Sequence, residues 1–352
     1  MIDFDDIFGH DEPISMLRRQ LSSSKGAHAL LLEGPSGVGK RLTALATAAA
    51  HLCDDPGGAG PCGDCRACRQ IKAGSHYGLW LIDPDISEDE RDPDNPEPVA
   101  GMLPRLFEDS SGAGTIGIDP VRSLREELSL KPSDDPRRAI VLADFDDATE
   151  DAQNALLKTL EEPPDDTLLL CTVTSREGIP ATITSRCQRL RFHPLSPDQV
   201  IRILSEHTDL SEERKRFLAR ISGGRPGMAL RFADGNLLDM RNWFIDQVEA
   251  YGGAEDPRFR QAVEDRLSGA SSKREAFTDF MMLQRALLRD ALYVRSGVEE
   301  KVELHFPEQL VRSFAGDRPV DRIIEEAERL EDLDTAQELY VNTKVLVENL
   351  PS

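Results

Sequence analysis

The stretch Gly34-Pro35-Ser36-Gly37-Val38-Gly39-Lys40-Arg41 constrains the fold more than any other feature of this sequence. It fits the phosphate-binding pattern G-x-x-x-x-G-K-S/T at every position except the last. The apolar run over 28–33 predicts a buried parallel strand before the loop, and the Ala- and Leu-rich run over 41–52 predicts a helix after it. Because strand, loop and helix occur together, we predict a phosphate-binding site. The residues expected to bind phosphate are Gly34, Gly37, Gly39 and Lys40.

Position 41 departs from this pattern. A Ser or Thr hydroxyl normally binds magnesium there, and arginine has no acceptor atom to offer. A second buried strand is predicted over 138–144, where phosphate-loop ATPases carry an aspartate that orders magnesium and a glutamate that polarises water. Here these two positions are Ala143 and Asp144, although another register makes Asp144 the magnesium ligand. Binding of ATP or ADP therefore stays open, and hydrolysis is not expected.

Four cysteines follow the predicted helix at spacings of eight, two and two intervening residues. Thiolates at such spacings can surround one tetrahedral zinc ion, with turn-forming glycines and a proline in the connection. Free thiols, disulfides and an iron–sulfur cluster are the alternatives. Since a four-cysteine site leaves no open position for a catalytic water, we expect a structural role. The predicted ligands are Cys53, Cys62, Cys65 and Cys68.

The charge of the chain argues against direct binding of nucleic acid. Its 352 residues include 42 Lys and Arg against 64 Asp and Glu, a net charge of -22. Neutralising phosphates requires a basic surface, so we expect a partner to hold any DNA. The acidic start and the lack of a long apolar run predict a cytoplasmic protein without a membrane span. The acidic segment over about 83–114 is expected to be a mobile surface insertion.

Two motifs in the middle of the chain are more specific. The segment 154–164 reads Asn-Ala-Leu-Leu-Lys-Thr-Leu-Glu-Glu-Pro-Pro and predicts a short helix stopped by two prolines. A third apolar run, over 167–173, predicts another strand, and Ser185-Arg186-Cys187 follows it. Together with the cysteine insert, they resemble the clamp-loader branch of the AAA+ ATPases, as found in the bacterial DNA polymerase III clamp loader. The resemblance is strong over the first two thirds of the chain and weak over the last third.

The resemblance implies a fold and a domain division. The fold is an α/β P-loop (AAA+) domain with a parallel sheet, followed by a small helical lid and an all-α collar domain. The expected domains are 1–193, with the zinc module at about 53–68, then 194–236 for the lid and 237–352 for the collar. Apolar residues three and four apart over much of the last segment agree with an all-helical collar.

The departures from the ATPase pattern are similar to those of delta-prime subunits, whose own ATP site is typically degenerate. Met228 agrees, because it stands where a nucleotide-sensing lid carries arginine, with Arg225 as a nearby alternative. The resemblance implies that Arg186 is an arginine finger, acting in trans on ATP bound by a neighbouring subunit. It also implies gamma/tau motor subunits and a delta subunit as partners in a hetero-pentamer, with the sliding clamp and primed DNA contacted mainly through the complex.

Three alternatives stay open. The chain could be an active gamma/tau-type ATPase, in which Asp144 binds magnesium and Lys40 binds ATP. It could be a zinc module that binds nucleic acid directly, which its charge disfavours. Finally, Arg186 could be a surface arginine that pairs with a carboxylate.

Overall fold

The protein is described here by a computed structural model that covers residues 3–23, 26–56, 60–83, 115–129, 137–235, 237–270, 273–301, 304–316, 318–338 and 347–350. It divides into two compact units. The first is Met1–His207 with Gly223–Arg231, and the second is Thr208–Ser222 with Phe232–Ser352. Within the described ranges, no helix has the length and apolar character that crossing a membrane requires.

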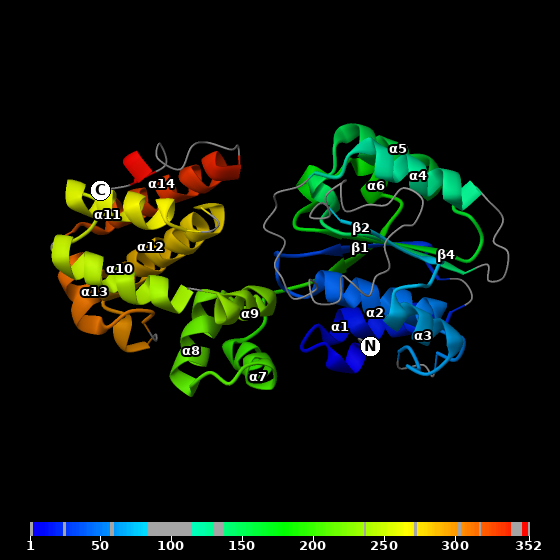
Figure 1. The fold of residues 1–352 in the computed structure, drawn as a ribbon, viewed down its shortest axis with the longest axis horizontal. Coiled ribbons are helices and arrows are strands. Elements are labelled where there is room, and N and C mark those ends of the chain that lie inside the picture. The colour runs from blue at the N-terminus through cyan, green and yellow to red at the C-terminus, as the bar shows by residue number, and fades with distance from the viewer. Residues whose placement is uncertain are drawn as a thin grey trace. The chain divides into compact units, whose positions relative to one another are not determined.

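A parallel sheet lies at the centre of the first unit (Figure 1). Its strands are hydrogen-bonded in the order β2-β3-β4-β1-β5, and every neighbouring pair is parallel. All seven residues of β4 are buried, as expected for a central strand covered on both faces. The strands are β1 (Ala29–Glu33), β2 (Leu79–Ile82), β3 (Arg138–Leu142), β4 (Thr167–Val173) and β5 (Gln188–Arg191).

Helices cover both faces of this sheet, with α1, α2 and α3 on one side and α4, α5 and α6 on the other (Figure 1). Alternate residues of β1 serve the two cores, because Leu30 and Leu32 join the cluster under α2 while Leu31 joins the cluster under α5. The helices of the first unit are α1 (Asp11–Leu21), α2 (Lys40–Leu52), α3 (Arg66–Ala73), α4 (Ile118–Ser129), α5 (Glu150–Glu161), α6 (Ala181–Thr184) and α7 (Pro197–His207). A 3-10 turn over Phe4–Asp6 precedes α1.

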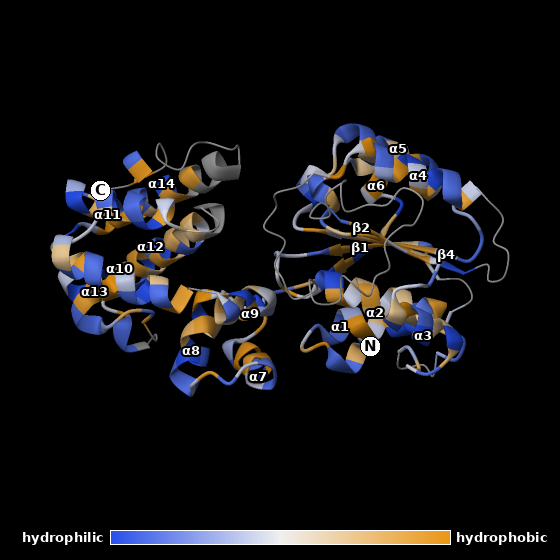
Figure 2. Cartoon of the chain, in the orientation of Figure 1, coloured by the Kyte–Doolittle hydropathy of each residue, from blue (hydrophilic) through white to orange (hydrophobic). Residues whose placement is uncertain are grey.

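The second unit is helical in its described part. Four aromatic rings pack together in it. The centre of the Phe244 ring lies 6.3 Å from that of Phe259, 5.8 Å from that of Phe280 and 5.7 Å from that of Phe306. Hydrophobic residues gather on the inward faces of these helices (Figure 2). The helices are α8 (Glu212–Ile221), α10 (Leu237–Tyr251), α11 (Pro257–Ser268), α12 (Lys273–Arg295), α13 (Glu308–Ala315) and α14 (Val320–Glu338). Helix α9 (Pro226–Asp234) crosses the boundary between the two units.

The predicted fold class is confirmed, with a parallel α/β domain followed by helices. The three apolar runs that were predicted to be strands, over 28–33, 138–144 and 167–173, correspond to β1, β3 and β4. Two strands, β2 and β5, were not predicted. Each has only four residues and lies at an edge of the sheet, and β5 reads Gln-Arg-Leu-Arg, so its hydrophobic signal is weak. The helix predicted over 154–164 begins earlier, because α5 starts at Glu150. Thr149 caps this start by accepting a hydrogen bond from the Ala152 N–H at 3.2 Å.

Candidate functional site

The phosphate loop connects the carboxyl end of β1 to the start of α2. Gly37 and Gly39 have φ values of 75° and 108°, in the left-handed region that favours glycine. A Cβ atom on Gly34 would lie 2.4 Å from the carbonyl oxygen of Phe192, so only glycine fits this close approach. The predicted strand, loop and helix are therefore formed, and each predicted glycine lies in the loop.

Lys40 is buried, and its ammonium group lies on the loop itself. Its Nζ donates hydrogen bonds to the carbonyl oxygens of Gly34 at 2.7 Å and Pro35 at 3.0 Å. A phosphate group bound by the loop would compete with these two carbonyls for the ammonium. The predicted phosphate-binding lysine is thus in place, held by backbone acceptors of the same loop.

Arg41 forms an ion pair with Asp83, the residue that follows β2. The side chain of Asp83 is fully buried, and that of Arg41 is 15% exposed. Asp83 was predicted to begin an acidic surface insertion, and for this residue the prediction is wrong, because its carboxylate is buried against a guanidinium. Residues 84–114, the rest of the predicted insertion, lie outside the described residues. The position that normally offers a magnesium ligand therefore carries a neutralised cation.

Ala143 and Asp144 follow β3 and lie beside this pair. Ala143 is fully buried, and its N–H donates to the carbonyl oxygen of Ile82 at 2.8 Å. The Asp144 N–H donates to the Thr172 hydroxyl at 2.9 Å, and its carboxylate lies 3.5 Å from the same hydroxyl. Asp144 lines the pocket over the phosphate loop. Of the two positions where phosphate-loop ATPases carry their magnesium and water carboxylates, only this one places a carboxylate in the pocket.

The pocket over the loop has an apolar part supplied by the N-terminal segment and two helices. Ile7 and Phe8 line it from the N-terminal side, and Ile203 and Leu230 line it from α7 and α9. The Arg202 guanidinium lies 4.8 Å from the centre of the Phe8 ring. An apolar wall next to a phosphate loop has the composition that a nucleotide base requires.

Helix α9 contacts the phosphate loop through Gly227. The Gly227 N–H donates to the Gly37 carbonyl oxygen at 2.8 Å, and a Cβ on Gly227 would lie 3.1 Å from Gly37. Met228, which was predicted to stand where a nucleotide-sensing lid carries arginine, is buried, with 4% of its surface exposed. The residue at the loop is one position earlier and has no side chain, because the backbones approach too closely to allow one.

His10 contacts the phosphate loop through a hydrogen bond to Val38. Its Nε2 lies 2.9 Å from the Val38 carbonyl oxygen, which places the proton on Nε2, and its ring lies 4.7 Å from that of Phe192. Burial lowers the pKa of His10. The imidazole is therefore a neutral packing and hydrogen-bonding group at neutral pH.

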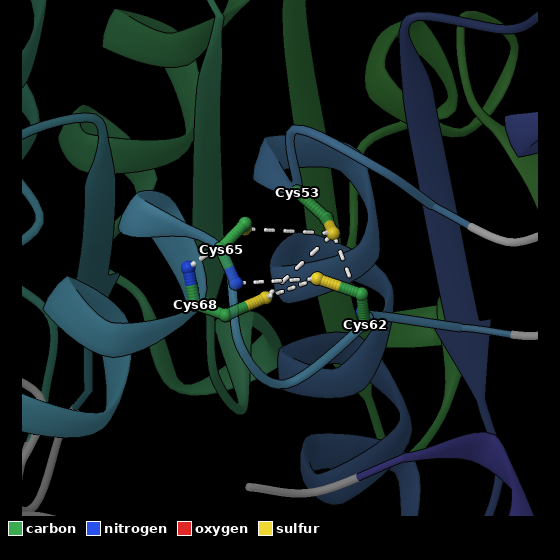
Figure 3. Close-up of side chains that lie close together, drawn as sticks. All are labelled: Cys53, Cys62, Cys65 and Cys68. Atoms are coloured by element: carbon green, nitrogen blue, oxygen red, sulfur yellow. Dashed lines mark hydrogen bonds between the residues drawn. The ribbon is translucent and has the colours of Figure 1, made fainter.

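The four predicted cysteines converge at the other end of α2 (Figure 3). The Cys53 sulfur lies 3.8 Å from that of Cys65 and 3.6 Å from that of Cys68, and the sulfurs of Cys62 and Cys68 are 3.9 Å apart. Four sulfurs at 2.3 Å from one tetrahedral zinc would be about 3.8 Å apart. These three separations are close to that value, and the four sulfurs all lie within 4.8 Å of one another, so the four thiols could hold a metal ion such as zinc.

Backbone and side-chain contacts support this cluster. The Cys62, Cys65 and Cys68 N–H groups donate to the sulfurs of Cys53, Cys62 and Cys65 at 3.3, 3.4 and 3.3 Å. The N–H groups of Asp64 and Cys65 lower the pKa of Cys62 to about 7, whereas burial raises the pKa of Cys53 and of Cys68. A bound dication would favour the thiolate form of all four side chains.

Arg137 connects the cysteine cluster to the sheet. It donates to the Cys53 carbonyl oxygen at 2.6 Å and to the Asp54 carboxylate at 2.8 Å, and it directly precedes β3. The cluster is therefore tied to two elements, α2 and β3, that also position the phosphate loop and Asp144.

Arg186 lies between α6 and β5 and is partly exposed. Its guanidinium donates to the Thr182 carbonyl oxygen at 2.7 Å and to the Glu161 carboxylate, at the end of α5, at 2.8 Å. The two side chains of this ion pair are 36% and 51% exposed. Arg186 is not among the described residues that line the phosphate-loop pocket of its own chain.

Several residues of these sites were not predicted. Asp83, Glu161, Arg137 and Gly227 each contact a predicted residue from a distant part of the chain. For Asp83 a signal was present, since an aspartate follows a short apolar run, Leu79–Ile82, as Asp144 follows another. The other three stand in no recognisable spacing to their partners.

The sequence matches the family described as DNA polymerase III, delta subunit, over residues 9–196. Among curated proteins, DNA polymerase III subunit delta' of Escherichia coli (strain K12) is 30% identical over 222 residues, which is 63% of this chain and 57% of that protein. Subunit delta' of Bacillus subtilis (strain 168) is 31% identical over 209 residues, 59% of this chain and 55% of that protein.

DNA polymerase III subunit tau of Bacillus subtilis (strain 168) is 27% identical over 250 residues, 71% of this chain and 38% of that protein. The matched region thus spans about half the length of these curated relatives, or less. A solved structure of a DNA polymerase III gamma subunit-related protein from Thermotoga maritima covers 97% of this chain and 100% of its own, with 17% identity and a TM-score of 0.39.

Proposed function

This chain belongs to the DNA polymerase III delta-subunit family, and we propose that it serves as a delta-prime-like accessory subunit of a clamp loader. In this role it helps ATP-driven loading of the sliding clamp onto primed DNA without hydrolysing ATP itself. The observation that carries this proposal is the buried ion pair of Arg41 with Asp83, which stands where an active subunit would hold magnesium. Two delta' subunits and a tau subunit are similar to the chain, so similarity alone does not distinguish a delta' role from a tau role. The residues of the phosphate-loop site are therefore used to distinguish them.

The proposed loss of hydrolysis follows from the chemistry of the phosphate loop. Position 41 offers a cation in place of a hydroxyl, and Ala143 offers no carboxylate. Phosphoryl transfer by phosphate-loop enzymes depends on a metal ion that neutralises charge between the outer phosphates. Without its protein ligands that ion is not held, and the rate of hydrolysis by the isolated chain should be negligible.

The proposed catalytic contribution of this subunit is Arg186, acting on ATP bound by a neighbouring motor subunit. A guanidinium is planar, permanently charged and rich in donors, which suits it to stabilise charge on a transferring phosphate. Its exposed pair with Glu161 supports this role, because exposed ion pairs contribute roughly 0.2–1 kcal/mol and are given up easily. The alternative, in which Arg186 pairs with a carboxylate, is thus compatible with a finger role: Arg186 would pair with Glu161 in the free subunit and leave it in the complex.

The remaining parts of the proposal concern architecture and partners. We assign one structural zinc to the four cysteines, and the three domains 1–193, 194–236 and 237–352 to the AAA+ module, lid and collar. The proposed partners are gamma/tau motor subunits and a delta subunit in a hetero-pentamer in the cytoplasm. Contacts with the clamp and primed DNA are assigned to the assembled complex, which agrees with the net charge of -22.

The decisive experiment reconstitutes the loader with Arg186→Ala. Arginine fingers are worth roughly 10³-fold or more in rate, so hydrolysis at the adjoining motor site should nearly stop, and the complex should lose the share of its ATPase activity that this site supplies. Arg176→Ala, an exposed arginine in the same loop region, is the matched control and should leave the rate unchanged. An assembled complex with Arg186→Ala and full ATPase activity would refute the finger.

A gamma/tau-type ATPase is the second candidate. It is favoured by the similarity to subunit tau and by the presence of Lys40 and Asp144 in one pocket. Magnesium-dependent ATP hydrolysis by the pure, isolated chain, lost in Lys40→Ala, would establish this function and replace our proposal.

A further inference from the structure

The four cysteines of the cluster are not held in the same way. Cys62, Cys65 and Cys68 are close in sequence, and the N–H groups of Cys65 and Cys68 donate to the preceding cysteine sulfur at 3.4 and 3.3 Å. One turn and the start of α3 therefore position these three thiols. Cys53 stands at the end of α2, with eight residues between it and Cys62, and its sulfur accepts from the Cys62 N–H at 3.3 Å. The backbone of Cys53 has to be fixed from another part of the chain.

We propose that Arg137 and Asp54 form a bridge that positions Cys53 for the metal ion and thereby raises the affinity of the cluster for it. The inference rests on the structural zinc that the proposed function assigns to the four cysteines. It extends that assignment to two residues that act through Cys53 and are not ligands themselves, so they are positioning residues.

The bridge spans the two sides of the cluster. The Arg137 Nη1 donates to the Cys53 carbonyl oxygen at 2.6 Å, and its Nη2 donates to one oxygen of the Asp54 carboxylate at 2.8 Å. The other oxygen of this carboxylate accepts a longer hydrogen bond, 3.5 Å, from the Ala67 N–H in the first turn of α3. A path of hydrogen bonds thus runs from the backbone of Cys53 to the helix that carries Cys68.

Arg137 is well placed to fix another segment because the sheet holds its own backbone. It directly precedes β3, where the Arg138 N–H donates to the Asp166 carbonyl oxygen at 2.9 Å and the Ala139 N–H donates to that of Gly78 at 2.8 Å. The guanidinium therefore projects from a strand end that is bonded on both sides. Outer contacts that orient metal ligands typically change metal affinity by about 10–100-fold.

The bridge acts through orientation and not through net charge. The Arg137 guanidinium is balanced by Asp54, and the exposed Asp55 and Asp64 lie in the same loops as the cysteines. The two side chains of the bridge are 27% and 45% exposed, so the ion pair by itself contributes little to stability. What Arg137 supplies is a rigid fork of donors that holds two acceptors at once, which a lysine ammonium does not reproduce.

The test measures the affinity of the full chain for zinc by competition with a chromophoric chelator. Arg137→Met keeps an unbranched side chain but removes both donors, and the dissociation constant for zinc should rise about tenfold or more. Arg138→Met is the matched control, because it removes the neighbouring arginine, which donates to the Leu128 carbonyl oxygen at 2.9 Å. Its dissociation constant should stay within about twofold of that of the unmodified chain. A value for Arg137→Met within the same range would overturn the inference.

Two further variants separate orientation from charge. Arg137→Lys keeps the charge without the fork, so it should lose affinity for zinc much as Arg137→Met does, and full affinity in this variant would overturn the bridge. Asp54→Ala breaks the same path from its other side. Because the two residues act as one unit, Arg137→Met combined with Asp54→Ala should lose little more affinity than either change alone. Losses that add in full would show that they act separately and would overturn the bridge as well.

A last pair of measurements separates positioning from a general effect on stability. The urea unfolding midpoint of the zinc-free chain should be the same for Arg137→Met and Arg138→Met, since the proposed role appears only when the metal is bound. A lower midpoint for Arg137→Met with unchanged zinc affinity would reduce Arg137 to a stabilising residue. Lack of saturable zinc binding by the unmodified chain would overturn the inference together with the zinc assignment. The proposed subunit role is read separately, from the ATPase activity of the assembled loader.

Discussion

The two ends of helix α2 differ in the side chains that they could offer to a metal ion. At the C-terminal end, Cys53 begins a group of four cysteines whose sulfurs all lie within 4.8 Å of one another and could hold a metal ion. At the N-terminal end, Lys40 and Arg41 follow the phosphate loop, and Arg41, at the position of the usual Ser or Thr, pairs with the buried Asp83. One helix thus joins a cluster of four thiols that could hold a metal ion to a phosphate loop whose last position carries a paired arginine.

The difference lies in where the ligands come from. All four sulfurs belong to a stretch of sixteen residues, from Cys53 to Cys68, so their spacing along the chain is sufficient to predict their meeting. A magnesium site at the phosphate loop needs side chains from the loop and from β3, which meet only after the sheet forms. A matching loop motif therefore predicts the phosphate site better than it predicts the metal.

The largest expected effect is the loss of zinc from the C-terminal end. We predict about one zinc per chain, detected by metal analysis of fresh, reduced protein. The change Cys65→Ser should reduce zinc to near zero and lower the free energy of unfolding by several kcal/mol, because binding of structural zinc contributes roughly 10–16 kcal/mol in small zinc modules. A strong chelator should have the same effect as the substitution.

The control for this prediction is Cys187→Ser, the same chemical change outside the cluster. This variant should keep its zinc. If purified protein holds no zinc, or if Cys65→Ser holds as much as the unmodified chain, the contrast between the two ends of α2 disappears.

The next effect concerns the ion pair at the N-terminal end. Removal of one partner from a buried pair costs about 3–5 kcal/mol, because the remaining charge stays buried without its counterion. We therefore expect Asp83→Ala to lower the stability of the first unit by that amount, measured from its urea unfolding transition. Asp119→Ala, which removes the exposed partner of Arg122 at 3.7 Å, is the matched control and should change stability by less than about 0.5 kcal/mol.

A double variant separates the cost of an unpaired charge from the value of the pair. Replacement of both partners by apolar residues of similar size is often neutral, so Arg41→Met with Asp83→Leu should recover most of the stability lost in Asp83→Ala. A single variant as stable as the unmodified chain would mean that the pair is not buried in solution. In that case the Arg41 side chain would be mobile and could move away to leave room for a metal ion.

The same distinction explains how much could be predicted from the sequence. The loop glycines, Lys40 and the four cysteines lie in short motifs, and their positions followed from local spacing. The start of α7 is also marked locally, because the Ser196 hydroxyl accepts from the Gln199 N–H at 3.3 Å in a capping box. By contrast, the partner of Arg41 lies 42 positions away, directly after an edge strand, and the close approach of Gly227 to Gly37 depends on how α9 packs. Such contacts depend on the fold, and no residue pattern near Arg41 or Gly37 indicates them.

The smallest expected effect concerns the second arginine that pairs with a carboxylate. Arg186 and Glu161 are both partly exposed, whereas Asp83 is fully buried, so the same pair of charges should contribute far less to stability. We expect Glu161→Ala to lower the free energy of unfolding by only about 0.2–1 kcal/mol, measured by the same urea titration as Asp83→Ala. A loss of about 3 kcal/mol or more would place Glu161 with the buried pairs. Arg186 would then be fixed by its own chain, and an arginine that its own fold cannot release is a poor candidate for reaching ATP on a neighbour.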